Sequence, residues 1–456
     1  MEGPSPKTAA VAPAAGPVLP DDAVVEIFKL LPARSLHRFK CVSRAWCGLV
    51  ADPIHREGYA QTLAGFFLRA AAAGGGGQGE SGSLGGVCEA YREGAGAGAC
   101  ADAGESSTRA CRHRRRFARR FLNLSRMAEP LVDAGFPFLP PGDEEGHRDV
   151  ILDSRDGLLL LGRFRTRDAP APLLRPPLRY LVCNPATEQF AAVPGSGWTP
   201  SNRGAMVRTY LLFDLAPGEF HLVQFWIDDM DAVRAVHTYS SAAAAWTDRA
   251  AEWLAGGWRD WARGVAPIQP GTGSAVVGGM LHLVVDTDGT AGPNNLVAVD
   301  AAGATRRTIP LPRRDVEEKD WYSVFLARSQ GSLHFVMCVR PGHGRLSEAA
   351  PLKLLVWVLE DYDAGEWVLK HTVSFPELFG RIACQFRVEY SVVAVHPDGN
   401  WVFFLRHWDR KLAAYDMDRR EVLDVGDLGL GDEDGDELPT PYVPLYMKLP
   451  MLTNKH

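Results

Sequence analysis

The sequence lacks the hydrophobic segments that would send the chain to a membrane or out of the cell. No apolar run in its 456 residues reaches the roughly 18 residues that a membrane helix needs. The first twenty residues carry Glu2, Lys7 and several prolines before Leu19, so the uninterrupted apolar core of a signal peptide is missing. We therefore expect a protein of the cytosol, the nucleus or both, with no membrane partner.

Paired cysteine motifs are also missing. The cysteines contain no CxxC pair and no regular spacing that would frame a zinc site or a disulfide scaffold. They are Cys41, Cys47, Cys88, Cys100, Cys111, Cys183, Cys338 and Cys384. We interpret them as reduced thiols, and the sequence predicts no metal and no cofactor.

An excess of positive charge is the third absence. The formal net charge is -6, which argues against a nucleic-acid partner. The 46% hydrophobic and 23% charged residues are typical of a globular protein. The length suits a small module followed by one large domain.

What is present begins with a helical pattern. Residues 1–17 are rich in Pro, Ala and Gly, which predicts a disordered tail. Residues 18–64 then carry apolar positions at three- and four-residue spacing, which predicts an all-α module of three short helices. Asp21 or Asp22 is the expected cap of the first helix and Ser35 of the second, while Pro32 and Pro53 are the expected stops. So small a module buries too little surface to be stable alone, and we expect a partner to cover it.

A short strand and a long loop follow. Gly65–Arg69 has the pattern of a strand, and from there to residue 110 the sequence is dominated by Gly and Ala. We predict a disordered loop in residues 65–110 after the strand. The loop is either a linker ahead of the next domain or an insertion within it.

Residues 111–456 predict a large all-β domain. Short strands rich in Val, Leu, Phe and Trp alternate with turns of Gly, Pro, Asp and Asn. Similar units follow one another near residues 154–194, 210–239, 278–312, 330–369 and 398–417. Such a succession favours a β-propeller, with a sandwich or an irregular barrel as alternatives.

The helical pattern resembles the F-box, whose usual sequence reads LPxD, an apolar helix, LP, SL and CVSxxW. The matching segments are Leu19–Asp22, Ile27, Leu30–Pro32, Ser35–Leu36 and Cys41–Trp46. The resemblance implies binding to a Skp-type adaptor of a cullin ubiquitin ligase. It implies that the following residues contribute to adaptor contact or to the small core behind it: Leu19, Pro20, Ile27, Leu30, Leu31, Pro32, Leu36, Val42 and Trp46. One departure is Ile54–His55, where the family usually has an aromatic residue.

The downstream sequence is similar to the F-box-associated β-domain common in plant F-box proteins. The segments that carry this similarity are 156–160, 182–187, 279–282 and 442–446. Together the two resemblances cover nearly the whole chain.

Several motifs have both a functional and a structural interpretation. The arginines within residues 112–120 are either a nuclear-import signal or a solvated surface. His282 and His334 occupy equivalent places in two units, which favours structural positions over metal ligation. The acidic run 424–437 favours a solvated loop, and the glycines near 271–279 favour turns over a phosphate-binding loop.

These patterns predict a substrate receptor that takes part in protein ubiquitination through protein–protein interaction. The F-box would bind the adaptor and the β-domain would bind a protein target, with no catalytic residue in this chain. Two alternatives stay open, which are a module that binds the adaptor outside a cullin complex and a propeller enzyme. The residues that bind the target are unknown from the sequence.

Overall fold

The computed structural model describes residues 19–31, 33–69, 119–124, 131–141, 147–165, 176–198, 206–214, 218–227, 233–248, 272–285, 295–312, 321–339, 351–386, 388–428 and 438–453. The chain divides into two compact units, Met1–Gln61 and Thr62–His456. No helix in the described part of the chain is long and apolar enough to cross a membrane.

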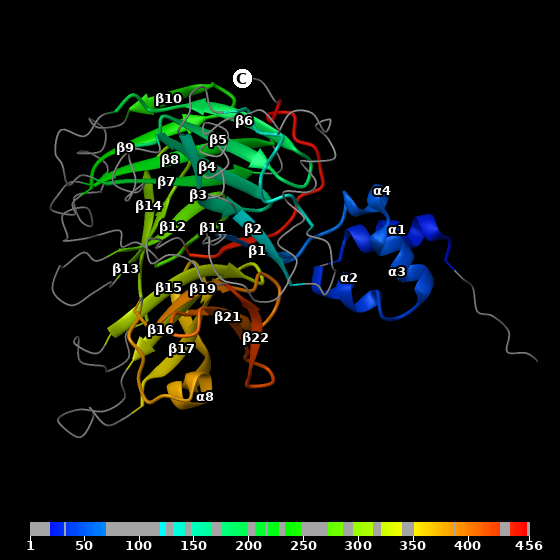
Figure 1. The fold of residues 1–456 in the computed structure, drawn as a ribbon, viewed down its shortest axis with the longest axis vertical. Coiled ribbons are helices and arrows are strands. Elements are labelled where there is room, and N and C mark those ends of the chain that lie inside the picture. The colour runs from blue at the N-terminus through cyan, green and yellow to red at the C-terminus, as the bar shows by residue number, and fades with distance from the viewer. Residues whose placement is uncertain are drawn as a thin grey trace, which may run out of the picture. The chain divides into compact units, whose positions relative to one another are not determined.

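The first unit consists of short helices, as the sequence predicts. They are α1 (Asp21–Lys29), α2 (Ala33–Phe39), α3 (Arg44–Ala51) and α4 (Pro53–Arg56) (Figure 1). The predicted stop at Pro32 lies outside the described residues.

The predicted helix caps need correction. The N-cap of α1 is Pro20, which makes no side-chain hydrogen bond, while Asp21 and Asp22 lie in the first turn. Their carboxylates still favour the positive end of the helix dipole there. Ser35 lies inside α2 rather than before it. The sequence pattern places an oxygen-bearing side chain near a helix start, but it does not fix which residue is the first of the helix.

A fourth helix was also missed. Ser43 caps α3 by accepting a hydrogen bond from the backbone nitrogen of Trp46 at 3.1 Å. Asp52 then caps α4 by accepting from the backbone nitrogen of Ile54 at 2.8 Å. Pro53 therefore begins a helix instead of only ending one, because the first helical position needs no N–H donor.

Within its described residues, the second unit contains six antiparallel sheets, five of four strands and one of three. The first four-stranded sheet contains β3 (His147–Arg155), β4 (Leu158–Arg165), β5 (Arg179–Asn184) and β6 (Gln189–Pro194). The second contains β7 (Met206–Asp214), β8 (Glu219–Ile227), β9 (Val233–Ser240) and β10 (Ala245–Asp248). The third contains β11 (Ser274–Val277), β12 (Met280–Val285), β13 (Asn295–Val299) and β14 (Thr305–Pro310).

The fourth sheet contains β15 (Trp321–Ser329), β16 (Ser332–Val339), β17 (Lys353–Asp361) and β18 (Glu366–Ser374). The fifth contains β19 (Tyr390–Val395), β20 (Trp401–Arg406), β21 (Lys411–Asp416) and β22 (Glu421–Asp427). The three-stranded sheet contains β1 (Gly65–Arg69), β2 (Arg119–Asn123) and β23 (Thr440–Tyr442). A short helix, α8 (Phe375–Phe379), follows β18.

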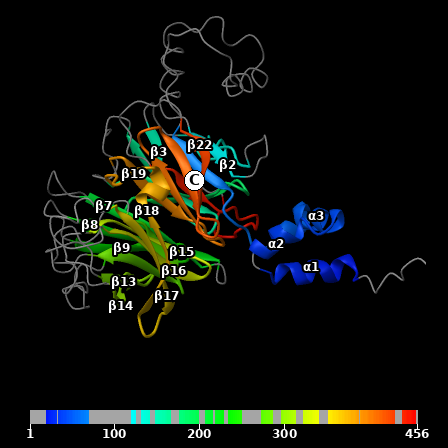
Figure 2. The same ribbon diagram turned by 90° about the horizontal axis from the view of Figure 1, so that it is seen from below.

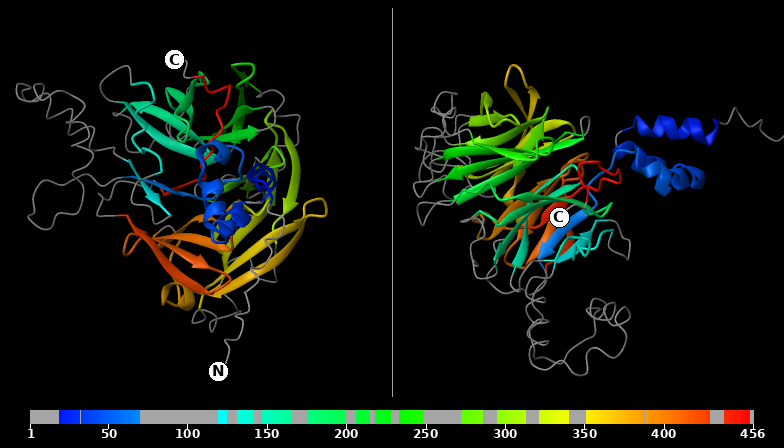
Figure 3. Two further views of the ribbon diagram at one scale, coloured as in Figure 1. Left: turned by 90° about the vertical axis from the view of Figure 1, so that its right-hand side faces the viewer. Right: turned by 90° about the horizontal axis from the view of Figure 1, so that it is seen from above.

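The sheets form a closed ring of six blades, so the predicted β-propeller is confirmed. Around the ring, β23 contacts β3, β3 contacts β7, β11 contacts β15, β15 contacts β19, and β19 returns to β23. The remaining step is made by β7 against β12 of the next blade. Figures 2 and 3 show the sheets following one another from cyan through green and yellow to orange.

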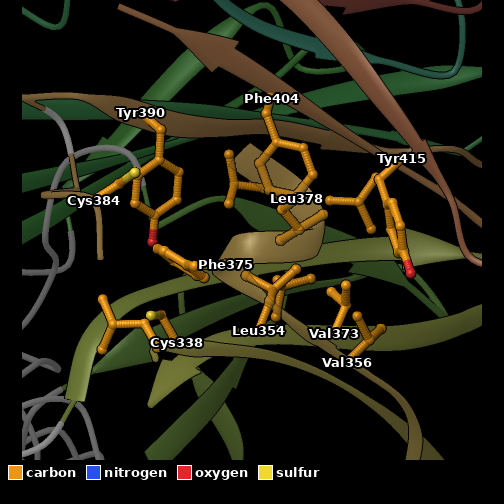
Figure 4. Packing of buried hydrophobic residues seen from close by; sticks show 14 of the residues in the cluster. Cys338, Leu354, Val356, Val373, Phe375, Leu378, Cys384, Tyr390, Phe404 and Tyr415 are labelled. Carbon is orange, nitrogen blue, oxygen red and sulfur yellow. The ribbon is translucent and has the colours of Figure 1, made fainter. Parts of the chain in front are cut away.

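Hydrophobic packing between neighbouring blades forms the core. Six clusters of buried residues each join two adjacent blades. In one of them, Tyr390 and Phe404 of one blade face Leu354 of the blade before it, with Phe375 of α8 in between (Figure 4). The rings of Phe375 and Tyr390 meet edge to face, with centroids 5.4 Å apart. Each blade thus packs against a neighbour on both faces, and the main core of the unit lies between blades.

Two tryptophans on outermost strands add a repeated polar contact between blades. Trp246 of β10 donates its indole N–H to the carbonyl of Pro194 in the preceding blade at 2.8 Å. Trp367 of β18 donates in the same way to Pro310 at 3.0 Å. Each accepting proline ends the fourth strand of its blade, so the same joint occurs at two places in the ring.

The three-stranded blade closes the ring with strands from both ends of the unit. β1 pairs with β2 on one side and with β23 on the other, with Gly65 opposite Tyr442. The domain limits therefore differ from the prediction that starts the β-domain at residue 111. Gly65–Arg69 already belongs to the propeller, although residues 70–118 separate it from β2.

The chain after β23 extends along the first blade as a terminal strap, residues 443–453. Asn184 donates its amide to the carbonyl of Leu445 at 2.8 Å. Gln189 accepts from the backbone nitrogen of Leu449 at 2.9 Å and donates to the carbonyl of Leu452 at 3.2 Å. Leu449 and Leu452 are buried in the cluster between the first two blades. The strap therefore extends the closure beyond β23.

We expect a chain ending at Leu438 to lose cooperative folding. It would lack the buried side chains of Tyr442, Leu449 and Leu452, each worth about 1.5–3 kcal/mol. Their sum is comparable with a whole domain's stability of about 5–15 kcal/mol. The measurement is thermal unfolding followed by circular dichroism. A control chain ending at Thr453 keeps the strap and should unfold as the parent does. A soluble, monomeric and cooperatively folded product ending at Leu438 would contradict this dependence on closure.

We also expect Glu377 of α8 to make stability depend on pH. Its pKa falls from 4.5 to about 2, first because the backbone N–H of Ser374 donates to it, and also because the Ser374 hydroxyl and Arg420 bond to it. Because the folded pKa is the lower one, this stabilisation is complete above pH 4.5 and is lost as the pH falls toward 2. The side chain is 50% exposed, which keeps the effect below about 1 kcal/mol.

Urea unfolding of Glu377→Gln and the parent between pH 7 and pH 3 tests this. The difference in unfolding free energy should shrink as the pH falls. Glu366→Gln, at an exposed strand start, is the matched control. A difference for Glu377→Gln that stays constant with pH would contradict the assignment.

Candidate functional site

The first unit is built around a small aromatic core. Val24, Val25, Phe28, Leu36, Val50 and Tyr59 are buried, and Leu31, Phe39, Trp46 and Leu49 pack against them. The ring of Phe28 lies 5.6 Å from Phe39 and 5.4 Å from Trp46. This core joins α1, α2 and α3 and fixes which helix faces are left outside.

The residues that the F-box resemblance singles out fall into two groups. Leu36 is buried, and Leu31 and Trp46 are half-buried against the same core. Leu19, Pro20, Ile27, Leu30 and Val42 are exposed. Pro32 lies outside the described residues. The sequence pattern therefore mixes residues that hold the unit together with residues that are free to meet a partner.

The exposed group includes large apolar side chains with high solvent exposure. Leu30 is 85% exposed, Val42 62% and Ile27 45%. The backbone nitrogen of Leu30 donates to the carbonyl of Ile27 at 3.1 Å, so the two residues lie about one turn apart at the end of α1. Several large apolar side chains left exposed on so small a unit favour an interaction surface. We call Leu19, Ile27, Leu30 and Val42 the open apolar set.

Ile54 belongs with this set and was not predicted as a site residue. It lies on α4 and is 81% exposed. The only signal in the sequence was its place next to Pro53, where the family usually carries an aromatic residue. An apolar side chain is thus kept at that position and is open to solvent.

The first unit also carries polar groups. Lys29 and Glu26 form an exposed ion pair of 2.7 Å on α1. Burial, with the nearby carboxylates of Asp52 and Glu26, raises the pKa of Tyr59, so its phenol stays neutral near pH 7. The Tyr59 hydroxyl donates to the carbonyl of Leu49 at 3.4 Å. The open apolar set therefore offers a contact whose free energy comes mainly from apolar burial.

In the second unit, charged side chains link the inner strands, which are the innermost strands of the blades and together form the inner ring. Arg155 of β3 lies 3.0 Å from Asp153 and donates to the carbonyl of Ser274 on β11 at 2.7 Å. Arg328 of β15 forms an ion pair with Asp156, which directly follows β3. β3 and β15 are three places apart in a ring of six, so this pair links opposite blades. The charges here bind one another.

Two further polar residues lie on β7 near this network. Burial raises the pKa of Tyr210 to about 12, so its hydroxyl is neutral near pH 7. Burial also lowers the pKa of Arg208. Asp153 accepts from the backbone nitrogen of Leu211 at 3.0 Å, which ties β3 to β7. These contacts hold inner strands together.

His282 and His334 lie on the second strands of consecutive blades, at the equivalent places that the sequence predicts. The ring of His282 meets the hydroxyl of Tyr362 in the next blade at 3.0 Å, and burial lowers its pKa to about 4. Burial also lowers the pKa of His334. Among the residues with described positions, no three His, Cys, Asp or Glu side chains are grouped to hold a metal ion.

The other sequence motifs are partly placed. Gly278 and Gly279 form the turn between β11 and β12, with φ of 58° and 71°, as the turn interpretation predicts. Arg119 and Arg120 belong to β2, whereas the arginines before residue 119 lie outside the described part. The acidic run begins in β22 at Asp424 and Asp427, and residues 429–437 are not described.

A search of solved structures finds matches at low identity and low TM-score, among them three enzymes. An exo-beta-1,3-galactanase from Phanerochaete chrysosporium, solved with galactose, has 8% identity and a TM-score of 0.31 over 62% of this chain and 63% of that chain. An alpha-L-arabinanase from Penicillium chrysogenum, complexed with arabinobiose, has 11% identity and a TM-score of 0.33 over 67% and 84%. A beta-fructofuranosidase from Bombyx mori has 10% identity and a TM-score of 0.34 over 62% of each chain.

This chain spans less than two thirds of the length of the galactanase and of the fructofuranosidase. Likeness at these scores carries no argument about activity. No curated protein matches the sequence.

The first unit does match a known family. The F-box domain family matches residues 17–57, a range that contains all four helices α1–α4 and the whole open apolar set. The chain thus carries an F-box domain at residues 17–57, followed by an all-β domain with six blades in a β-propeller arrangement.

Proposed function

We propose that this chain is the substrate-recognition subunit of an SCF-type ubiquitin ligase. Its F-box would bind a Skp-type adaptor and through it a cullin, and its propeller would bind a protein target. The observation that carries the proposal is the open apolar set on a unit that matches the F-box domain. F-box domains generally bind such adaptors, and the exposed leucine, isoleucine and valine supply the apolar contact.

The chain's contribution to ubiquitination would be proximity. Holding a target near the ubiquitin-charged enzyme raises the effective concentration of the target. Transfer of ubiquitin to the target's lysines then becomes effectively intramolecular. This role needs a rigid receptor, which the closed ring supplies, and it needs no acid, base or nucleophile from this chain. We therefore propose a non-catalytic receptor that works in the cytosol, the nucleus or both, with an F-box-associated domain of the kind common in plants.

Two other functions would use the same parts. The F-box could bind the adaptor in a complex that never includes a cullin. Co-purification of the adaptor with or without a cullin separates this alternative from the main proposal. A propeller enzyme is the second alternative; on the inner strands, Arg155 pairs with Asp153 and Arg328 with Asp156, so these four charges bind one another.

We expect Leu30→Ala to weaken adaptor binding at least tenfold. Burying a leucine side chain is worth about 1.5–3 kcal/mol, and about 1.4 kcal/mol corresponds to tenfold in Kd. The side chain is 85% exposed in the free chain, so its truncation should leave the unit folded. Isothermal titration with a purified Skp-type adaptor measures Kd, and circular dichroism monitors the fold.

Two control variants distinguish a loss of surface contact from a loss of the folded core. Leu423→Ala, at an exposed apolar position on β22, should leave Kd unchanged. Phe28→Ala removes the centre of the aromatic core and should cost about 3–5 kcal/mol, unfolding the F-box and abolishing binding. Changes at Leu31 are less informative because Leu31 packs against that core. If a folded Ile27→Ala, Leu30→Ala double variant binds as tightly as the parent, the docking role is wrong.

A further inference from the structure

Lysine is distributed unevenly along the chain. Residues 41–318 contain 29 arginines and no lysine, whereas the rest of the chain contains 11 arginines and nine lysines. The nine lysines are Lys7, Lys29, Lys40, Lys319, Lys353, Lys370, Lys411, Lys448 and Lys455. A general preference for arginine would affect both parts of the chain alike. The lack of lysine is therefore a property of residues 41–318.

These residues form most of four consecutive blades of the ring. The first three blades, from β3 to β14, and the strands β1 and β2 of the closing blade all lie within them. The remaining strand of the closing blade, β23, has no lysine either. The four blades follow one another, since β23 contacts β3, β3 contacts β7 and β7 contacts β12. We call these four blades the lysine-free arc.

The chain from the F-box enters the ring within the lysine-free arc. Ala64 donates to the carbonyl of Tyr442 at 3.0 Å and accepts from the backbone nitrogen of Leu124 at 2.9 Å, so it already belongs to the closing blade. The first unit ends at Gln61, and Leu63 is buried in a cluster of the ring. The blade that follows the F-box directly in the chain is therefore a lysine-free one.

Exposed ion pairs on the third and fourth strands of neighbouring blades show the same division. In the fourth blade, Lys370 of β18 pairs with Glu360 of β17 at 2.7 Å, and Lys411 makes a similar pair in the fifth blade. In the third blade, which belongs to the lysine-free arc, Arg306 of β14 pairs with Asp300. An exposed pair with either cation contributes at most about 1 kcal/mol. Stability alone therefore does not require an arginine at this position.

Only some arginines of the lysine-free arc are required by the fold. The guanidinium of Arg163 donates to both carboxylate oxygens of Asp149, at 2.8 and 2.9 Å, which a lysine cannot do. Arg165, two residues further along β4, is exposed. Lysine supplies a solvated charge of this kind equally well. The fold therefore does not account for the lack of lysine at every position.

The chemistry of ubiquitin transfer separates the two cations. The neutral amine of a lysine attacks the carbonyl carbon of the thioester that joins ubiquitin to the charged enzyme. A C–N bond forms, the C–S bond breaks, and the proton lost by the amine ends on the enzyme's cysteine. The guanidinium of arginine keeps its proton and its delocalised charge, so it is no acceptor. A lysine held near the thioester is modified because proximity raises its effective concentration.

One lysine lies along the lysine-free arc although it comes from a later part of the chain. Lys448 belongs to the terminal strap, which extends along the first blade. The next residue, Leu449, is buried and donates its backbone N–H to Gln189 of that blade at 2.9 Å. Lys448 itself is exposed. Its amine is therefore open to solvent while its backbone is held against the first blade.

We propose that the lysine-free arc is the part of the ring that meets the ubiquitin-charged enzyme, and that Lys448 is the acceptor at which this chain ubiquitinates itself. The inference rests on the proposed function, since the ligase brings the charged enzyme. The arginines of the lysine-free arc then leave the thioester to the lysines of the target. Lys448 supplies the one position at which the receptor itself is modified.

The test uses the full chain assembled with a Skp-type adaptor, a cullin and the ubiquitin-charged enzyme. Gel electrophoresis gives the rate at which ubiquitin is added to this chain, and mass spectrometry of tryptic peptides maps the acceptor lysines. We expect Lys448→Arg to lower the rate by about fivefold or more, because it removes the acceptor nearest the thioester. Lys370→Arg removes another exposed lysine and should leave the rate unchanged.

Variants made in the Lys448→Arg chain test the lysine-free arc itself. Arg165→Lys and Arg306→Lys each place a lysine within it and keep the charge, and the side chain of Arg306 is 61% exposed. We expect at least one of them to restore the rate, with ubiquitin on the new lysine. Arg419→Lys, at a 73% exposed position of the fifth blade, is the matched control and should not restore it. Circular dichroism checks that each variant is folded.

Several results would overturn the inference. They are an assembled parent chain that receives no ubiquitin, ubiquitin found mainly on a lysine other than Lys448, and equal restoration of the rate by Arg419→Lys. Co-purification with the adaptor and the cullin is measured first. A chain that does not assemble with them contradicts the proposed function as well. An assembled chain whose modification ignores these substitutions contradicts this inference alone.

Discussion

Packing between neighbouring blades is the interaction on which the second unit depends. Six hydrophobic clusters join neighbouring blades all the way round the ring, so a blade removed from it would expose both of its faces. Such an arrangement is stable only when the ring is closed. Closure in turn rests on β23, a strand of three residues that pairs with β1 and places the two ends of the unit in one sheet.

The first unit follows the opposite principle. Its core contains few buried side chains, and several of its largest apolar residues remain in solvent. A small helical unit cannot surround all of its apolar residues, so the part left over is available for a partner. The helices of the first unit leave apolar side chains exposed from Leu19, before α1, to Ile54 on α4. This unit is therefore suited to an apolar contact.

The sequence predicted the helices and the propeller but not all of the strands. The repeating units were recognised by their glycine turns and the apolar strands after them, such as Leu158–Arg165. Tyr210–Asp214 of β7 was recognised, but most of the other inner strands before the turns were missed, and β3 shows why. His147–Arg155 mixes charged and apolar residues because it carries the polar network of the inner ring, so neither an alternating nor a continuous apolar pattern appears.

The site was predictable to a similar degree. The motif identified Leu30 and Leu36 together, yet only three-dimensional packing shows that the first is 85% exposed and the second 2%. Ile54 was noticed as a departure and not as a site residue, because a family pattern alone does not report exposure. The predicted cap of α1 was wrong for a local reason. Two adjacent aspartates each satisfy the sequence pattern of a cap, whereas the residue that directly precedes the helix is Pro20.

The connection between β1 and β2 has a further consequence. Two strands that pair directly are joined by residues 70–118, so their register is not set by a tight turn but by side chains such as Phe67 and Phe121, whose rings lie 4.9 Å apart. A register set by side chains does not depend on the length of the connection, so a change in the number of residues between 70 and 118 should leave the pairing of β1 with β2 in place.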